Sequence, residues 1–211
     1  MLLLENVQKY YGGFLAMNIP TLFIEQGIWW IQGENGSGKT TFLKMIAGLH
    51  QFTGTILLNN KLNLSRQRQA FLKAVNYAEA EPLYPSFLTA KDLVNFYCNT
   101  KGGNPSQIEE LLKHLHLFDA YTKPLGTYSS GMTKKLSLAL AFAGQPILVL
   151  LDEPLTTIDK AAIETICTTI KEYLGKGVSF MVTSHQPVDN NMLSFTGKLI
   201  AKERTICYEE V

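Results

Sequence analysis

Residues 33–40, which read GENGSGKT, constrain the fold of this chain more than any other stretch. They follow a short apolar run at residues 27–33 (GIWWIQG) and lead into residues 39–49 (KTTFLKMIAGL), whose apolar side chains share one helical face. The sequence therefore predicts a buried strand, a glycine-rich loop and a helix, in this order. A loop with the pattern G-x-x-x-x-G-K-[ST] in this setting directs its backbone N–H groups at phosphate oxygens.

The side chains of this loop match the needs of phosphate and metal binding. Lys39 is expected to reach the β and γ phosphates of a nucleotide, and the Thr40 hydroxyl to ligate Mg²⁺. The glycines permit a tight turn. A glycine-rich turn that matches the pattern by chance is the alternative. The expected phosphate-binding residues are Gly33, Glu34, Asn35, Gly36, Ser37, Gly38, Lys39, Thr40 and Thr41.

A second apolar run, at residues 147–151 (ILVLL), ends in the carboxylates Asp152 and Glu153. Open α/β sheets place their sites at the carboxyl ends of strands. Asp152 is therefore suited to hold Mg²⁺, and Glu153 to polarise an attacking water. A buried strand that merely reaches solvent at this point is the alternative.

His185 directly follows a third apolar run, at residues 178–184 (VSFMVTS). If that strand lies parallel to the one before Asp152, the imidazole could reach the γ-phosphate of a bound nucleotide. A neutral imidazole donates one hydrogen bond and accepts another. A purely structural histidine is the alternative.

Apolar runs alternate with helical stretches along the chain, which favours an α/β fold with a buried and mostly parallel sheet. Residues from about 85 to 135 differ, because helical patterns dominate there. Thr89 is the expected N-cap of one helix, and Asn104 followed by Pro105 marks the start of another. We read this part as a helical insertion into the α/β core.

The composition excludes several classes of protein. The chain of 211 residues is 46% hydrophobic and 18% charged, with a net charge of +1 and neither a polybasic arm nor an acidic tail. No nucleic acid partner is expected from this balance. Cys98, Cys167 and Cys207 are far apart in the sequence, so we expect reduced core thiols in a cytosolic protein rather than a metal site.

Residues 128–132, which read YSSGM, raise a further question, because they precede another helical run. Ser129 is a good N-cap, and Gly131 permits close approach to the backbone. A helix N-terminus of this kind attracts anions. The chain thus contains a second anion-binding feature in addition to its phosphate loop.

In the order of these motifs the sequence resembles the ATP-binding subunits of ABC transporters over nearly its whole length. GENGSGKTT is similar to the family's Walker A motif, YSSGM to its signature motif (usually LSGGQ), and LLDEP to its Walker B motif with the catalytic glutamate. LTTID, ending at Asp159, resembles the D-loop, and SHQ resembles the H-loop. Tyr11 stands where the family stacks an aromatic ring on adenine. Tyr10 is a second candidate, and a tyrosine of the core is the alternative for either.

The resemblance implies a P-loop NTPase with a mostly parallel core sheet, an N-terminal antiparallel β subdomain and an α-helical insertion. It implies a single ABC ATPase domain, with residues 1–84 and 136–211 as the core and 85–135 as the helical subdomain. ATP and Mg²⁺ are the implied cofactors. The implied catalytic residues are Lys39, Glu153 and His185, and the implied metal ligands are Thr40 and Asp152.

The resemblance also explains the second anion-binding feature. In this family the signature helix binds the γ-phosphate of ATP that is held by a second subunit. The implied contacts to nucleotide outside the phosphate loop are those of Tyr11, Ser129, Ser130, Gly131 and Asp159. A homodimer or a heterodimer with a second ATP-binding subunit follows. Separate membrane-spanning permease subunits are implied too, which would place the chain at the cytoplasmic face of a membrane.

The sequence departs from the family at a glutamine that contacts Mg²⁺ and water. Alignment of VNYAEAEPLYP (75–85) on Y-x-x-Q-E-P puts Ala80 at that position. Alanine has no ligating atom. Glu79 and Glu81 flank it, and Glu81 acting through a water is the expected substitute. ATP binding does not depend on this contact.

The signature motif departs as well, because Tyr128, Ser130 and Met132 replace leucine, glycine and glutamine. This version resembles the ABC-2-type exporter branch, so we expect a subunit that powers export. One alternative is the ATP-binding subunit of a haem exporter of the cytochrome c maturation type. Another is a soluble ABC ATPase that acts on ribosomes or DNA, although the usual tandem domains, coiled coils or basic extensions are not found. A switch that binds ATP without turnover is disfavoured by Glu153.

Overall fold

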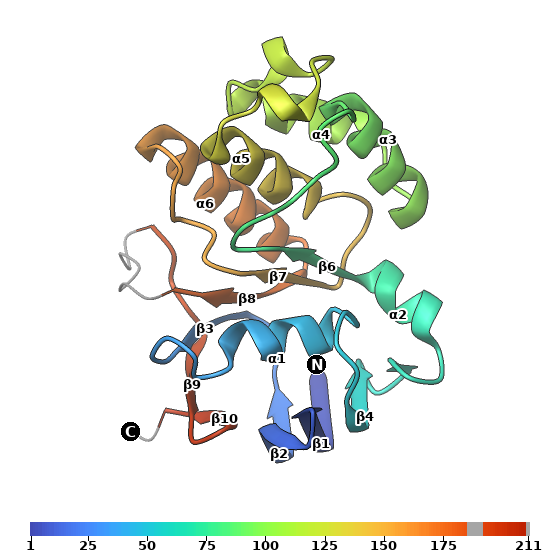
Figure 1. The fold of residues 1–211 in the computed structure, drawn as a ribbon, viewed down its shortest axis with the longest axis vertical. Coiled ribbons are helices and arrows are strands. Elements are labelled where there is room, and N and C mark those ends of the chain that lie inside the picture. The colour runs from blue at the N-terminus through green and yellow to red at the C-terminus, as the bar shows by residue number, and fades with distance from the viewer. Residues whose placement is uncertain (185–191, 210–211) are drawn as a thin grey trace.

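A computed structural model describes residues 1–184 and 192–209 of the chain as two sheets with helices around them (Figure 1). The first sheet has four strands in the order β2-β1-β4-β5. Its strands are β1 (Leu2–Tyr11), β2 (Phe14–Ile24), β4 (Thr53–Leu58) and β5 (Leu62–Asn63). All their pairings are antiparallel. The antiparallel N-terminal sheet that the resemblance implied is therefore confirmed.

The second sheet has six strands in the order β10-β9-β3-β8-β7-β6. Its strands are β3 (Ile28–Gln32), β6 (Val75–Ala78), β7 (Leu148–Leu151), β8 (Ser179–Thr183), β9 (Gly197–Lys202) and β10 (Thr205–Tyr208). All neighbours pair in parallel except β9 and β10, which are antiparallel. Every residue of β7 and β8 is buried, as expected for central parallel strands. The predicted mostly parallel sheet is confirmed.

The six-stranded sheet separates two hydrophobic cores. Along β7, Val149 and Leu151 belong to one core, whereas Leu148 and Leu150 belong to the other. In Figure 1, α3 (Ala90–Lys101), α4 (Pro105–His114), α5 (Ser130–Leu140) and α6 (Lys160–Gly175) lie on one side of this sheet. The opposite side holds α1 (Lys39–Ile46) and the antiparallel sheet, with α2 (Arg68–Ala74) beside them. The strands are thus covered on both faces.

The helical insertion contains α3 and α4, two short 3₁₀ turns (Phe118–Ala120 and Leu125–Thr127) and the start of α5. The predicted boundary between residues 135 and 136 falls within α5, and the division of the chain into core and insertion remains a prediction. None of the helices in residues 1–184 and 192–209 combines the length and the apolar composition that crossing a membrane requires.

The predicted helix starts in the insertion are confirmed. The Thr89 hydroxyl accepts a hydrogen bond from the Asp92 N–H at 3.1 Å, and the Asp92 carboxylate accepts one from the Thr89 N–H at 2.9 Å. This reciprocal pair is a capping box. Asn104 caps α4 through the Ser106 N–H at 3.1 Å, with Pro105 in the first turn.

Thr89→Ala is expected to lower the free energy of unfolding by about 1 kcal/mol, because the helix loses its N-cap acceptor. Thr100→Ala on the same helix is the matched control. The Thr100 hydroxyl only donates back to the Phe96 carbonyl at 2.7 Å, so its loss should change stability by less than about 0.5 kcal/mol. Urea unfolding of both variants gives the comparison, and equal losses would contradict the capping role.

The expected burial of the cysteines in the core is confirmed for two residues and wrong for the third. Cys98 and Cys167 are buried, whereas Cys207 is partly exposed on the edge strand β10. All three thiols are free. Burial raises the pKa of the Cys98 and Cys167 thiols, which keeps them protonated and unreactive.

Candidate functional site

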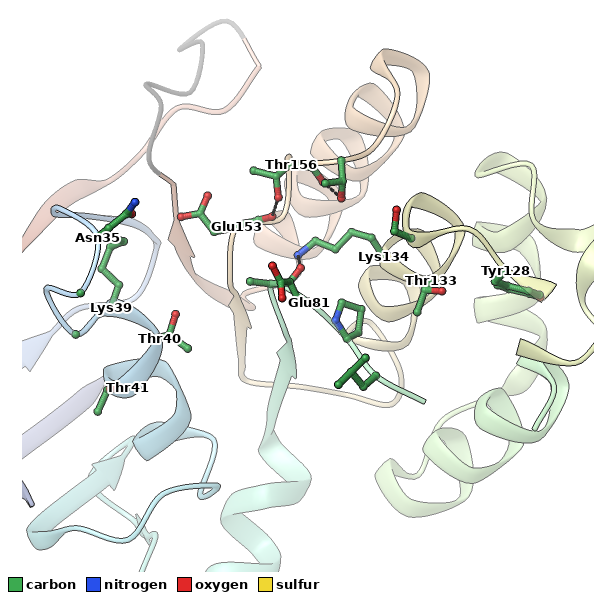
Figure 2. A pocket seen from close by; sticks show the side chains of 17 residues that line it. Asn35, Lys39, Thr40, Thr41, Glu81, Tyr128, Thr133, Lys134, Glu153 and Thr156 are labelled. Carbon is green, nitrogen blue, oxygen red and sulfur yellow. Dashed lines mark hydrogen bonds between the residues drawn. The ribbon is translucent and has the colours of Figure 1, made fainter. Parts of the chain in front are cut away.

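A cavity of about 840 Å³ lies at the carboxyl ends of the parallel strands. Its walls come from four segments that are far apart in the sequence, and Figure 2 shows their side chains converging on it. These segments are residues 35–41, 80–83, 128–134 and 153–157. The phosphate loop, the start of the signature helix and the end of β7 therefore face one space.

The phosphate loop connects β3 to α1 through glycines in left-handed conformations. Gly36 has φ 78° and Gly38 has φ 102°, values that residues with a side chain rarely adopt. Gly38 is the N-cap of α1, and none of the described residues supplies a side-chain cap there. The first N–H groups of α1 have no carbonyl within the helix. They are thus available to an anion at the mouth of the loop.

Lys39 is held inside this loop. Its side chain is only 6% exposed, and its ammonium donates to the carbonyl oxygens of Gly33 at 2.7 Å and Glu34 at 3.0 Å. Burial lowers the pKa of Lys39, while the charges of Glu153 and Asp152 oppose that shift. A positive charge thus stands at the centre of a loop lined with N–H donors, which suits a polyphosphate.

Asp152 lies at the end of β7, behind the cavity wall, and is 1% exposed. Its two carboxylate oxygens accept hydrogen bonds from the hydroxyls of neighbouring strands: Thr183 on β8 at 2.7 Å and Tyr77 on β6 at 3.2 Å. Each carboxylate oxygen has lone pairs for about two contacts, so each can accept one more. Together with the Thr40 hydroxyl, which lines the cavity, Asp152 offers the hard oxygen donors that fit Mg²⁺.

Glu153 lines the cavity, and in Figure 2 its side chain extends toward the phosphate loop. Its backbone has φ 48°, an uncommon value for a residue that is not glycine. The Glu153 N–H donates to the Thr183 hydroxyl at 2.9 Å. The side chain predicted as a base is therefore directed at the space in which a nucleotide would lie.

The signature motif forms the predicted helix N-terminus. Ser129 is the N-cap of α5, and its hydroxyl accepts from the Met132 N–H at 3.2 Å. Ser130 lines the cavity. A Cβ added at Gly131 would lie 3.0 Å from the Thr157 carbonyl oxygen, so a side chain there would crowd the segment after β7. Figure 1 shows that the start of α5 and the phosphate loop belong to different layers of the molecule.

Asp159 occupies a related position at the start of α6. It accepts from the Ala162 N–H at 2.9 Å and forms an ion pair with Lys135. These two contacts, the lysine first, lower the pKa of Asp159 to about 2. The carboxylate therefore remains charged at neutral pH. These contacts give Asp159 a structural role as the cap of α6. Its contact with a nucleotide remains a prediction.

The predicted aromatic stack is not part of the cavity wall. Tyr11 and Tyr10 are 44% and 46% exposed, so the alternative of a core tyrosine is wrong for both. The Lys9 ammonium lies 4.5 Å from the centre of the Tyr11 ring, and the Tyr11 hydroxyl is 3.4 Å from the His50 Nε2.

His185, the predicted contact to the γ-phosphate, lies outside the described residues.

The segment with Ala80 at the glutamine position also reaches the cavity. Ala80 and Glu81 line it, whereas Glu79 forms an ion pair with Lys44 at 3.5 Å. Glu81 is thus at the cavity wall and Glu79 is not, and the role of Glu81 as the replacement for the missing glutamine remains a prediction.

Three polar residues that support the site were not predicted from the sequence: Tyr77, Thr183 and Lys134. Lys134 is 1% exposed, and burial lowers its pKa to about 8, opposed by Asp152, Glu153 and Glu81. Thr183 could have been noticed, because it is a polar residue at the carboxyl end of a buried parallel strand. Lys134 gave no such signal, because a lysine near the start of a helix usually faces solvent.

Comparison with known proteins gives one family. The sequence model of the family described as ABC transporter matches residues 18–156. A lantibiotic transport ATP-binding protein of Streptococcus pyogenes is 29% identical over 187 residues, which cover 88% of this chain and 80% of the relative. Nod factor export ATP-binding protein I of Burkholderia orbicola (strain AU 1054) is 31% identical over 186 residues, with coverages of 86% and 61%.

A solved structure shares the fold over almost the whole chain. The ATP-binding subunit of an ABC transporter superposes with a TM-score of 0.88, covering 99% of this chain and 90% of that chain at 21% sequence identity. A likeness at this identity concerns the arrangement of the elements. It agrees with the layers described above.

Proposed function

Because the chain belongs to the ABC transporter family, we propose that it is the ATP-binding subunit of an exporter and hydrolyses ATP to drive transport through separate membrane-spanning subunits. The observation that carries this proposal is the cavity that unites the Lys39 loop with Glu153. The names of two relatives, for lantibiotic transport and for Nod factor export, support transport as the role and export as its direction. The cargo would be chosen by the membrane subunits.

In the proposed mechanism the phosphate loop binds the nucleotide. The N–H groups at the start of α1 and the Lys39 ammonium hold the β and γ phosphate oxygens. The Thr40 hydroxyl and the Asp152 carboxylate would hold Mg²⁺, which when bound neutralises part of the phosphate charge. Tyr77 and Thr183 keep the Asp152 carboxylate in place through their hydroxyl hydrogen bonds.

Glu153 acts as the base in this mechanism. Its carboxylate orients the attacking water and accepts a proton from it as the water oxygen bonds to the γ-phosphorus, while the bond from that phosphorus to the bridging oxygen breaks and ADP leaves. Positioning and charge stabilisation supply most of the rate in phosphoryl transfer. His185 would donate a hydrogen bond to the γ-phosphate.

A complete site needs a second ATP-binding subunit in this proposal. The N-terminus of α5, with Ser129, Ser130 and Gly131, would bind the γ-phosphate of the nucleotide held by that subunit. Tyr11 would stack on adenine, and Asp159 would contribute from the start of α6. The chain would act at the cytoplasmic face of the membrane, with residues 1–84 and 136–211 as the core and 85–135 as the helical subdomain.

ATP turnover and partner capture test the function together. The purified full chain should release phosphate from ATP in the presence of Mg²⁺. A tagged chain should co-purify from membranes with a protein that has several membrane spans. Capture of ribosomes or DNA instead would favour a soluble ABC ATPase, and a chain that binds ATP without releasing phosphate would favour a switch.

Lys39→Ala is expected to raise the dissociation constant for ATP by about 10- to 150-fold, because hydrogen bonds to charged groups contribute about 1.5–3 kcal/mol. Lys44→Ala on the same helix is the control. Lys44 forms a partly exposed ion pair with Glu79, which should have little influence on ATP. Isothermal calorimetry gives both constants, and an unchanged constant in Lys39→Ala would contradict the phosphate-loop assignment.

A further inference from the structure

Lys134 joins three segments of the cavity through a single buried charge. It extends from α5, and its ammonium donates to the carbonyl oxygens of Glu79 at 2.8 Å, Ala80 at 3.0 Å and Asp152 at 2.8 Å. An ammonium has three N–H donors, so all of them are used. A buried charge is tolerated when it is fully hydrogen-bonded in this way. In Figure 2 the side chain extends from the signature helix to the centre of the site.

The peptide group between Asp152 and Glu153 is therefore held at both of its polar atoms. Its carbonyl oxygen accepts from the Lys134 ammonium at 2.8 Å, and its N–H donates to the Thr183 hydroxyl at 2.9 Å. Two opposed hydrogen bonds fix the plane of this peptide. The plane matters because the next residue, Glu153, has φ 48°. A left-handed conformation at a glutamate is unfavourable and persists only where the surroundings enforce it.

From this geometry we propose that Lys134 is a positioning residue for Glu153: with Thr183 it clamps the peptide between Asp152 and Glu153 and so directs the Glu153 carboxylate into the site. The inference rests on the proposed role of Glu153 as the base. Lys134 does not touch the nucleotide in this proposal. It acts through the backbone of the residue before the base.

The same ammonium connects this peptide to the segment that follows β6. The carbonyls of Glu79 and Ala80 come from the position where the family's glutamine would stand, and Ala80 has no polar side chain. The Lys134 ammonium links that segment to the end of β7, and its acceptors on both sides are main-chain carbonyl oxygens. The direction of Glu153 thus depends on where residues 79 and 80 lie.

The test compares two lysines that make the same kind of contact. Lys101 on α3 is partly buried, and its ammonium donates to the carbonyls of Leu72 on α2 and Val75 at the start of β6, away from the cavity. Methionine is an unbranched side chain that resembles the apolar body of a lysine and lacks its donors. Lys134→Met and Lys101→Met should therefore both lower the thermal unfolding midpoint.

The kinetic constants of the full chain separate the two variants. Lys134→Met should lower kcat about 10- to 100-fold, because a small misplacement of a catalytic group has effects of this size. The KM for ATP should change less than about threefold, since the phosphate loop is untouched. Lys101→Met should retain kcat within about threefold of the wild type. Equal kcat values in folded Lys134→Met and Lys101→Met would overturn the proposal.

A double variant tests whether Lys134 acts through Glu153. If it does, adding Lys134→Met to Glu153→Gln should change the residual single-turnover rate by less than about twofold, because the group that Lys134 positions is already lost. A further tenfold loss would overturn the proposal. A wild-type chain without turnover, or Glu153→Gln at the wild-type rate, would instead contradict the proposed function.

Lys134→Gln provides a milder variant should the methionine variant fail to fold. The glutamine amide has two N–H donors and a shorter reach, so it cannot satisfy all three carbonyls. Its kcat should be at least about threefold below the wild type at an unchanged KM, which supports the clamp. A folded Lys134→Gln chain with the wild-type kcat would overturn it.

Discussion

Replacement of Glu153 by glutamine is expected to slow ATP hydrolysis by roughly 10²–10⁴-fold, the usual contribution of a positioned base. The amide has nearly the size of the carboxylate and can still contact a water. It cannot take a proton from that water. ATP binding should remain close to normal, because the phosphate loop and Lys39 are unchanged and one negative charge near the phosphates is removed.

The phosphate-release rate and the dissociation constant for ATP, measured on the same preparation, check this expectation. Glu153→Gln should also accumulate as an ATP-bound dimer in gel filtration, because the nucleotide is not consumed. Glu172→Gln is the control, since Glu172 is an exposed glutamate on α6 outside the cavity wall. Hydrolysis at the wild-type rate in Glu153→Gln would exclude Glu153 as the base.

Much of the fold could be predicted because local sequence and final structure agree. β7 and β8 are short runs of apolar residues that become fully buried central strands. The predicted N-caps of α3 and α4, Thr89 and Asn104, act within their own helices. Local signals of this kind do not depend on distant parts of the chain.

The strand β2 could not be predicted in this way. Its buried residues are Met17, Ile19, Leu22 and Ile24, so the alternation breaks at Pro20 and Thr21. Proline usually excludes a strand. The segment is nevertheless a strand because it pairs with β1 along its length, from Leu2 opposite Ile24 to Tyr11 opposite Phe14. Long-range pairing, which a single sequence does not display, overrides the local signal.

The residues of the candidate site likewise fall into those that the sequence predicts and those that it does not. The residues of the phosphate loop and the carboxylates after β7 could be predicted, because their chemistry is written in side chains at fixed spacings. Lys134 could not, because its partners are main-chain carbonyls about 18 to 55 positions away, and any residue type can supply a carbonyl. Thr183 gave a signal as a polar residue at the end of a buried strand, but its contact with Asp152, like that of Tyr77, depends on the order of the strands.

Ser129→Arg is expected to abolish ATP hydrolysis while ATP binding to the same chain stays nearly normal. In the proposed dimer the N-terminus of α5 must approach the γ-phosphate held by the second subunit within hydrogen-bond distance, about 2.7–3.2 Å. The positive charge of arginine would attract the phosphate, but its bulk occupies the space of close approach at the exposed start of the helix. We expect the steric effect to dominate, so the chain should fail to form the ATP-bound dimer.

The loss of the helix cap must be separated from this steric effect. Ser129 caps α5 through the Met132 N–H, and any substitution without an acceptor removes that bond. Ser129→Ala is the matched variant, because it loses the cap, worth about 1 kcal/mol, without adding bulk. It should retain the dimer in gel filtration with ATP. Loss of the dimer in both variants would assign the defect to the cap.

Mixing the Ser129→Arg chain with a Lys39→Ala chain tests whether each site is built from both subunits. In a heterodimer of the two, one site contains both substitutions. The other site combines an intact phosphate loop with an intact signature helix. Each variant alone should be inactive, and the mixture should recover part of the wild-type phosphate release. Two chains that each carried a complete site could not complement each other in this way, so a mixture as inactive as its components, or full activity of Ser129→Arg alone, would refute the shared site.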